Sequence, residues 1–156
     1  MLIRVIAVGT RMPGWVQQAV DDYGNRLPSE LRLEWKEVRA EQRSSRESAA
    51  TWMAREAQRI RSALPAQAAL VALDEQGHDL DTLAFADRLR RWQLAARPVA
   101  ILIGGPDGLD PELKSEAGEK IRLSSLTLPH PLVRVVLAEQ LYRAWSVLAD
   151  HPYHRA

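Results

Sequence analysis

The spacing of apolar residues changes along the chain between the period of a strand and the period of a helix. Residues 2 to 8 (LIRVIAV) form a short run rich in β-branched side chains that ends at Gly9, which is typical of a strand. After Pro13, apolar side chains recur at intervals of three or four residues until Pro28, as on one face of an amphipathic helix. The chain is therefore predicted to begin with a strand followed by a helix.

This alternation of predicted strands and helices continues to the end of the chain. Residues 31 to 38 show the period of two that indicates a half-covered strand, whereas three later runs are typical of strands buried on both faces. The predicted buried strands are residues 68 to 74, 98 to 104 and 121 to 128. Further helices are predicted from Arg46 to Leu64, from Leu80 to Gln93, briefly after Pro111, and from Pro131 to Asp150.

The order of these elements favours an α/β fold, with a mostly parallel sheet and helices on both of its faces. The length of 156 residues suits a single domain, residues 1 to 156. Ligands of such sheets bind outside the carboxyl ends of the strands. We therefore expect the functional site in the loops that follow Asp74, Ile103 and Leu123.

Composition excludes several classes of protein. Hydrophobic residues make up 46% and charged residues 26% of the chain, which are values of a globular protein rather than a disordered one. The chain has no cysteine, which excludes disulfides and thiolate metal sites. The N-terminal apolar run is too short for a signal peptide, and no run of about 18 apolar residues follows it. We therefore expect a cytoplasmic protein that does not span a membrane.

The net charge of +1 implies no general electrostatic attraction to nucleic acid, so such a partner would need a local basic patch. The segment from Arg39 to Arg61 is one candidate, because it holds six arginines and three glutamates. The alternative is a solvated helix surface, where runs of charge usually lie.

The stretch GGPDG, residues 104 to 108, directly follows a predicted buried strand. Gly104 and Gly105 permit positive φ and let a ligand lie against the backbone, although a tight turn would also explain them. The stretch matches neither GxGxxG nor a phosphate loop with GK[ST]. Asp74 precedes these glycines, whereas in a Rossmann unit the acidic residue follows them. The pattern therefore disfavours an ordinary dinucleotide-binding fold.

Residues 123 to 131 (LSSLTLPHP) mix leucines with hydroxyl side chains. Small-molecule pockets are usually lined in this way, and core packing at a strand end is the alternative. His130 lies in this stretch, and His151 and His154 lie near the C-terminus. They lack a further carboxylate or histidine at a spacing typical of a metal site, so we predict no metal.

The predicted terminal helix is apolar over most of its circumference, since 13 of the 18 residues from Leu132 to Ala149 are apolar. Such a helix is buried on more than one side, and in a chain of this size the second side is expected to be another subunit. Arg134 is a lone charge on the apolar face. It needs a partner or an anion, unless it reaches back to water from the start of the helix.

Three stretches together resemble one known family: ILIGGPDGL, LSSLTLPHPLVRVVLAEQLYRAWS and the closing HPYHR. With VGTRMPGWV near the start, they are similar to the ribosomal RNA large subunit methyltransferase H family of the SPOUT superfamily. That family methylates N3 of a pseudouridine in 23S ribosomal RNA. The resemblance implies a homodimer whose subunits each bind S-adenosylmethionine in a C-terminal trefoil knot. It also implies that the substrate is 23S ribosomal RNA within the 50S subunit or the 70S ribosome.

The same resemblance assigns cofactor binding to segments at the three strand ends. The matching positions are Leu73, Gly104, Leu123, Ser124, Ser125, Leu126, Thr127 and Leu128. The family usually has glutamate where this chain has Asp107, which is a small departure. Residues 40 to 62 are the least similar part of the chain, and no role is assigned to them.

The C-terminal tail, residues 151 to 156, carries most of the candidate catalytic groups. His154, or a water beside it, is a candidate base for the N3 proton, with Arg155 or Arg143 as a candidate electrostatic partner. Tyr153 and His154 are also flat groups suited to stacking on an RNA base. We expect the tail to fold back toward the cofactor, and the alternative is that it anchors the dimer.

Two other functions fit the same pattern. One is a catalytically inactive, ribosome-associated binding protein of the same fold. The other is an enzyme that acts on a small metabolite. Cofactor binding argues against the first, and a requirement for assembled ribosomal particles argues against the second.

Overall fold

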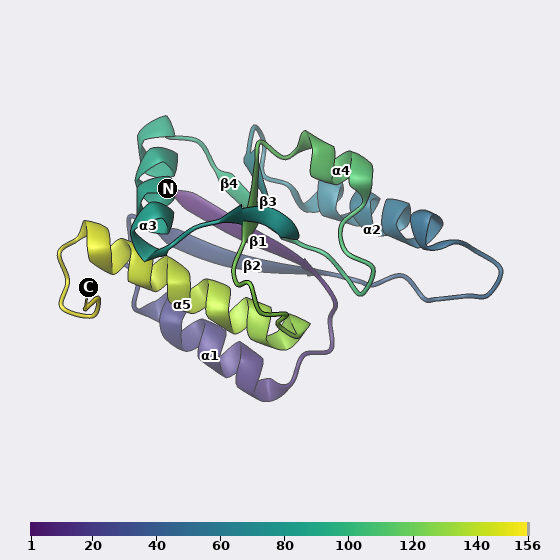
Figure 1. Ribbon diagram of the computed structural model, residues 1–156, viewed down its shortest axis with the longest axis horizontal. Helices are drawn as coiled ribbons and strands as arrows, with labels where there is room; N and C mark the ends of the chain where they lie inside the picture. The colour runs from purple at the N-terminus through teal and green to yellow at the C-terminus, as the bar shows by residue number, and fades with distance from the viewer. Residues whose placement is uncertain (156) are drawn as a thin grey trace.

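A parallel sheet of five strands forms the centre of the computed structural model, which describes residues 1–155 (Figure 1). The strands are β1 (Leu2–Val8), β2 (Arg32–Val38), β3 (Ala69–Asp79), β4 (Val99–Ile103) and β5 (Glu119–Arg122). Their order in the sheet is β2-β1-β4-β3-β5, and every neighbouring pair is parallel. The predicted α/β fold with a mostly parallel sheet is therefore confirmed. Ala156, the last residue of the predicted domain, lies outside the described residues.

Helices cover both faces of this sheet, as predicted (Figure 1). They are α1 (Gly14–Asn25), α2 (Ala49–Ala63), α3 (Thr82–Ala95), α4 (Pro111–Glu116) and α5 (His130–Leu148). Side chains of β1 alternate between the two faces, so that Val5 packs with residues of α3 and α5 while Ile6 packs with residues of α2 and α4. α1 packs against α5, where Val20 lies beside Ala138.

β4 is buried over its whole length, as its apolar sequence predicts. Ile101 packs on the α3 and α5 side of the sheet, and Leu102 packs on the α2 and α4 side. Burial of each such side chain stabilises the fold by about 1.5–3 kcal/mol. Because both faces of β4 are held, the loop that follows it starts from a fixed point in the middle of the sheet edge.

The strand predicted for residues 121 to 128 is wrong in its bounds and in its burial. β5 ends at Arg122, and it is an edge strand that pairs only with β3. Residues 123 to 129 leave the sheet as a loop, and the side chain of Leu126 is 75% exposed. The alternating leucines and hydroxyls predict a strand because periodicity does not distinguish a strand from a loop that lines a pocket.

β3 is longer than its apolar sequence predicts, because its second half meets β5 again. Both Leu73 and His78 are in register with Ile121, and the strand is irregular between them. At Gly77 a Cβ atom would lie 2.6 Å from the backbone carbonyl carbon of Ile121, so only glycine allows this approach. This double contact holds β5 and the following loop beside β3. The trefoil knot implied by the family resemblance stays a prediction.

α5 contacts both α1 and α3 on one face of the sheet (Figure 1). These neighbours cover much of its apolar surface, so Leu137 and Leu141 are fully buried within the single chain. These neighbours supply part of the cover that the apolar sequence of the helix requires, and the second subunit expected against it stays a prediction. Leu132 and Leu148, near its two ends, remain exposed. Within residues 1–155, no helix is long and apolar enough to cross a membrane.

Candidate active site

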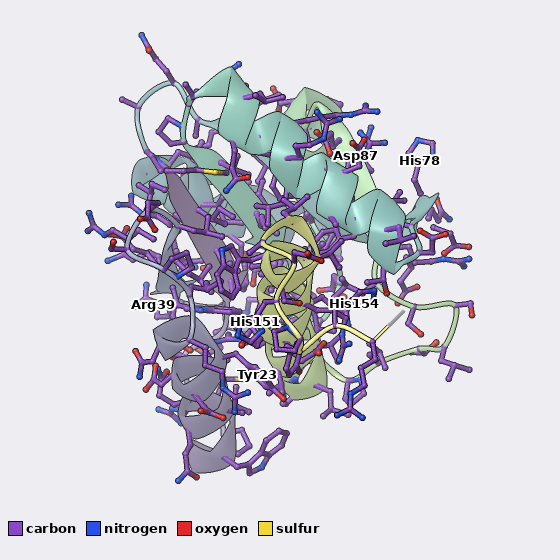
Figure 2. The ribbon with its side chains drawn as sticks, turned by 90° about the vertical axis from the view of Figure 1, so that its left-hand side faces the viewer. Tyr23, Arg39, His78, Asp87, His151 and His154 are labelled. Atoms are coloured by element: carbon purple, nitrogen blue, oxygen red, sulfur yellow. The ribbon has the colours of Figure 1, made fainter. Side chains whose placement is uncertain are left out.

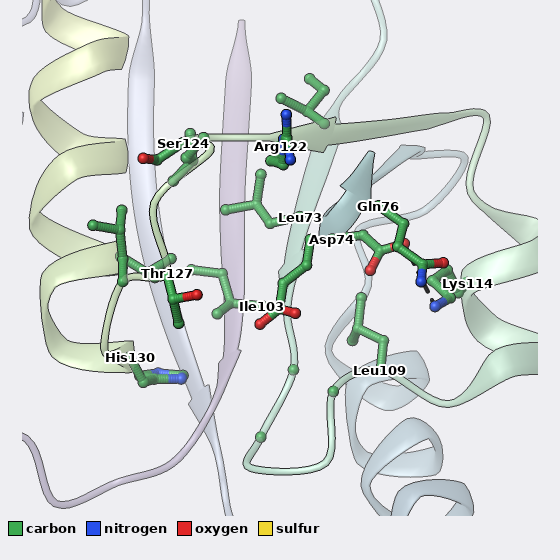
Figure 3. Close-up of a pocket in the computed structure, with 18 of the residues that line it drawn as sticks. Leu73, Asp74, Gln76, Ile103, Leu109, Lys114, Arg122, Ser124, Thr127 and His130 are labelled. Atoms are coloured by element: carbon green, nitrogen blue, oxygen red, sulfur yellow. Dashed lines mark ion pairs between the residues drawn. The ribbon is translucent and has the colours of Figure 1, made fainter. Parts of the chain in front are cut away.

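A cavity of about 570 Å³ lies at the carboxyl ends of β3, β4 and β5 (Figure 3). Its volume is within the range of small-molecule sites. It is lined by residues 73–76 in the irregular middle of β3, residues 103–109 at and after the end of β4, and residues 121–124 with 126–128 at and after the end of β5, together with Lys114, His130 and Val133. The structure therefore brings together the three segments in which the sequence predicts a site. The loop predicted after Asp74 is wrong, because β3 continues to Asp79, where it pairs with β5 again. Of the eight cofactor positions implied by the resemblance, all but Ser125 line this cavity.

The glycine-rich loop, residues 104–108, is a tight turn at the rim of the cavity. A Cβ atom on Gly104 would lie 2.5 Å from the carbonyl carbon of Gly108 and 2.6 Å from the nitrogen of Leu109. The Gly108 amide donates to the Gly105 carbonyl at 2.9 Å, and Gly108 has a positive φ of 84°. The prediction of positive φ at Gly104 and Gly105 is therefore wrong. Gly104 is required because the loop's own backbone occupies the space of a side chain.

The loop of residues 123–129 forms the opposite wall of the cavity (Figure 3). The Leu126 amide donates to the Ser124 hydroxyl at 2.9 Å, which turns the chain at this point. The segment has no helix or strand pairing of its own. The Pro129 carbonyl accepts from the Val133 amide at 3.1 Å, whereas the backbone groups of residues 124–128 that make no such bond are available to a ligand.

The cavity combines an apolar floor with charged groups of both signs. Leu73, Ile103 and Leu109 supply apolar surface, while Asp74, Glu75 and Asp107 supply carboxylates. The Lys114 ammonium lies 3.5 Å from the Asp74 carboxylate, and Arg122 donates to Asp79 at 2.6 Å. This lining suits a ligand with an apolar body and both positive and negative groups.

His130, at the start of α5, joins the cavity to a buried arginine. The Arg134 Nε donates to the Nε2 of His130 at 2.9 Å, its Nη2 donates to the Gly9 carbonyl at 2.8 Å, and its Nη1 pairs with the Glu37 carboxylate. Arg134 is 3% exposed, so the partner expected for it is present and it does not reach back to water. Burial, followed by the charge of Arg134, lowers the pKa of His130 below its ordinary value. His130 is therefore a neutral acceptor. Through Arg134 it is linked to Gly9, directly after β1, and to Glu37 on β2.

The tail folds back onto the second half of α5. The Tyr153 hydroxyl donates to the Glu139 carboxylate at 2.8 Å, and Arg143 donates to the same oxygen at 2.9 Å. The Arg143 guanidinium also lies 4.8 Å from the centre of the Tyr153 ring. Burial, and then the Glu139 hydrogen bond, raises the pKa of Tyr153 above its ordinary value. Two candidate catalytic residues, Arg143 and Tyr153, are thus held together, with the phenol protonated.

The other two candidates in the tail are less constrained. Both ring nitrogens of His154 are shielded from solvent and have no hydrogen-bond partner among residues 1–155. The side chain of Arg155 is exposed. Figure 2 shows His151 and His154 in front of the end of α5, with Tyr23 of α1 nearby.

None of these four candidate catalytic residues lines the cavity. The cavity is at the start of α5, where His130 lies, and the tail is at the opposite end of the helix (Figure 1). With a rise of about 1.5 Å per residue, Arg143 is about 20 Å along the helix from His130. The expectation that the tail folds back to the cofactor is therefore wrong for the cavity of its own chain.

Sequence reasoning missed several of the residues that line the cavity. Lys114 and Gln76 lie outside every motif, whereas His130 belongs to the stretch of residues 123–131 that the sequence predicts to line a pocket. The position of Lys114 on α4, directly after the glycine-rich loop, is the one signal in the sequence that points to it. In the described part of the chain, no three side chains of metal-binding type lie close enough to hold an ion.

Comparison with known proteins identifies the family of this chain. Residues 1–154 match the family described as "Predicted SPOUT methyltransferase". Proteins called ribosomal RNA large subunit methyltransferase H are 58% identical in Bordetella petrii and 55% identical in Burkholderia thailandensis, each over 156 residues and 100% of both chains. A probable methylase family protein from Haemophilus influenzae Rd KW20 has the same fold, with a TM-score of 0.60 at 12% identity over 99% of this chain and 70% of that one. The chain belongs to the SPOUT methyltransferase family.

Proposed function

We propose that this protein transfers a methyl group from S-adenosylmethionine to N3 of a pseudouridine in 23S ribosomal RNA, within the 50S subunit or the 70S ribosome. The observation that carries the proposal is that Leu73, Gly104, residues 123–124 and residues 126–128 line one cavity. These are the positions that the family resemblance assigns to the cofactor, and they come from three separate strand ends. The full-length similarity to relatives named as ribosomal RNA methyltransferases supports the same substrate class.

The residues of the cavity fit S-adenosylmethionine. When bound, this cofactor supplies an activated methyl group on a sulfonium. The apolar floor at Leu73 and Ile103 suits its uncharged parts, and the backbone groups of residues 124–128, which belong to no helix or strand, suit the edge of an adenine. The carboxylate of Asp74 suits its positive groups.

Among the tail residues, His154 is the best candidate for the base that takes the N3 proton. Tyr153 is a poor base because its hydroxyl donates to Glu139 and its pKa is raised. The two nitrogens of His154 have no partner within residues 1–155, so one of them is free to accept a proton. The exposed guanidinium of Arg155 is available to stabilise negative charge on the base or to bind phosphate.

Because the tail lies far from the cavity of its own chain, we propose a homodimer in which each tail serves the cavity of the other subunit. Exposed apolar side chains near the cavity end of the molecule support this arrangement. They are Trp15 on α1, Leu126 in the cavity wall and Leu132 on α5.

The deciding experiment is transfer of labelled methyl from S-adenosylmethionine to purified 50S or 70S ribosomes that contain the pseudouridine. Ribosomes with uridine at the same position are the matched control, and free 23S ribosomal RNA tests the need for an assembled particle. We expect labelling only of assembled particles that contain pseudouridine. Cofactor binding without any transfer would favour an inactive binding protein, and transfer to a small metabolite would favour the other alternative.

A further inference from the structure

The β2–α2 segment, residues 39–48, lies against the glycine-rich loop although the two are far apart in the sequence (Figure 1). This segment is the first part of the charged stretch from Arg39 to Arg61, which the sequence predicts as a candidate basic patch. Four of the six arginines in that stretch instead pair with carboxylates of the same chain. The pairs are Arg43 with Glu56 and Asp107, Arg55 with Glu41 and Glu47, Arg59 with Glu41, and Arg61 with Glu116. Most of its positive charge is therefore used within the fold.

Arg43 is the arginine that connects this segment to the cavity. Its Nη1 donates to the Glu56 carboxylate at 2.9 Å, and its Nη2 donates to the Asp107 carboxylate at 2.7 Å. Asp107 lines the cavity, whereas Arg43 and Glu56 do not. The guanidinium also lies 5.2 Å from the centre of the Trp52 ring. The planar, two-pronged guanidinium is suited to hold two carboxylates in a fixed relation.

Glu56 is a buried anchor for this contact. It is 2% exposed, and one of its oxygens accepts hydrogen bonds from both Arg43 and the Glu41 amide, the latter at 2.8 Å. Its other oxygen lies against the glycine-rich loop, 3.4 Å from where a Cβ atom on Gly105 would be. A buried carboxylate needs such compensation, so Arg43 is held firmly on the Glu56 side. The Nη2 atom of the same guanidinium then holds the Asp107 carboxylate in place.

We propose that Arg43 is a positioning residue, which holds the glycine-rich loop in its cavity-lining conformation through Asp107 and thereby raises cofactor affinity. A loop that is ordered before binding pays less conformational entropy when the ligand arrives. The loop has few other fixed contacts, chiefly the hydrogen bond between the Gly108 amide and the Gly105 carbonyl. The affinity part of this inference rests on the proposed use of S-adenosylmethionine, whereas the ordering of the loop does not.

The test compares Arg43→Gln and Asp107→Asn with Arg55→Gln as the matched control. Arg55 lies on the same charged stretch and pairs with Glu41 and Glu47, but it does not contact the cavity lining. Asp107→Asn leaves the buried pair of Arg43 and Glu56 in place, so that variant is expected to fold. The measurements are amide hydrogen exchange of residues 104–109 in the free protein and the Kd for S-adenosylmethionine by calorimetry.

We expect faster exchange in the loop and a Kd raised about 5-fold in both test variants, and no change beyond about 2-fold in Arg55→Gln. The double variant should be no weaker than Arg43→Gln, because both substitutions remove one contact. Asp107→Glu, which introduces the residue usual in the family, should retain the affinity. These results would support the positioning role.

Unchanged exchange and Kd in Arg43→Gln would overturn the proposal. Additive losses in the double variant would also overturn it, since they would mean that Asp107 acts on the cofactor independently of Arg43. Absence of S-adenosylmethionine binding in the unmodified protein would count against the proposed function. In that case the exchange rates of the loop would still decide whether Arg43 positions it.

Discussion

At the scale of single residues, Gly104 is the position where the cavity tolerates the least change. A methyl group there would meet the backbone of Gly108 and Leu109 at 2.5–2.6 Å, so the loop must move. We predict that Gly104→Ala, and more so Gly104→Val, raises the Kd for S-adenosylmethionine at least about 10-fold, which corresponds to a loss of about 1.4 kcal/mol. Calorimetry on the folded variant is the measurement.

The matched control is Gly24→Ala, at a glycine on α1 with open space where the Cβ atom would lie. Removing a glycine from a helix should raise the free energy of unfolding by about 0.5–1 kcal/mol without altering cofactor binding. Denaturant unfolding of both variants separates loss of the site from loss of the fold. Wild-type affinity in a folded Gly104→Val protein would remove the glycine-rich loop from the site.

At the scale of elements, α5 carries the cavity wall at its start and the tail at its end. We predict that deletion of residues 151 to 156 leaves a dimer and lowers methyl transfer to ribosomes by at least about 100-fold, as expected for the loss of positioned acid–base groups. The reason is that the tail packs on the surface of α5 through Tyr153 and Glu139, outside the main core. Sedimentation and transfer of labelled methyl measure the two effects, and dissociation into monomers would instead favour an anchoring role.

A mixed dimer shows which cavity the tail serves. One subunit lacks residues 151 to 156, and the other carries Gly104→Ala with its tail intact. If the tail serves the partner's cavity, this dimer has one complete site. It should then recover about half of the normal activity at a concentration of S-adenosylmethionine too low to fill the Gly104→Ala cavity, at which each parent dimer is strongly impaired. Activity that stays at the level of the parents would mean that each tail serves its own cavity.

At the scale of the whole molecule, the chain is expected to be an obligate homodimer whose interface brings the cavity end of one subunit against the tail end of the other. Trp15, Leu126 and Leu132 are exposed at the cavity end, at 49%, 75% and 39%, and Leu148 is exposed at the tail end of α5. Exposed apolar side chains of this kind are typical of an interface. We predict that Leu132→Lys produces monomers and abolishes methyl transfer, because a lysine ammonium would be costly to bury between subunits. Sedimentation velocity at micromolar concentration is the measurement.

Leu94→Lys is the matched control for that substitution. Leu94 is 73% exposed and lies near the end of α3, at the opposite edge of the sheet from the cavity. This variant should remain a dimer with normal activity. A stable monomer of the unmodified chain with full activity would contradict the dimeric arrangement.

Much of the fold follows from local pattern. The strand predicted at residues 2 to 8 has the same bounds as β1, and the wholly apolar run at 98 to 104 contains the fully buried β4. The helix expected from Arg46 begins at Ala49 instead, because the Ser48 hydroxyl accepts a hydrogen bond from the Thr51 amide and starts the helix there. These bounds can be predicted from the sequence because the spacing of apolar residues and the residues at the ends of an element lie within one short segment.

Part of the site was also predictable from the sequence. In a parallel sheet the carboxyl ends of all strands lie at one edge, so the loops after Ile103 and Leu123 were expected to lie together. Residues 74–76 join them although β3 continues to Asp79, because the strand is irregular between Leu73 and His78. The structural role of individual residues in those loops was harder to predict from the sequence. The sequence indicated glycine at 104 for its φ, whereas the structure requires it for the close approach of Gly108.

The sequence by itself thus determined the order of strands and helices, the parallel sheet and the edge at which ligands bind, because these depend on periodicity within short segments. Only the tertiary structure decided which distant residues meet. Arg134 is paired with Glu37, Arg43 spans Glu56 and Asp107, and Tyr153 returns to Glu139. It also placed the tail about 20 Å along α5 from the cavity. These contacts depend on the path of the whole chain, and no local pattern of apolar and polar residues encodes that path.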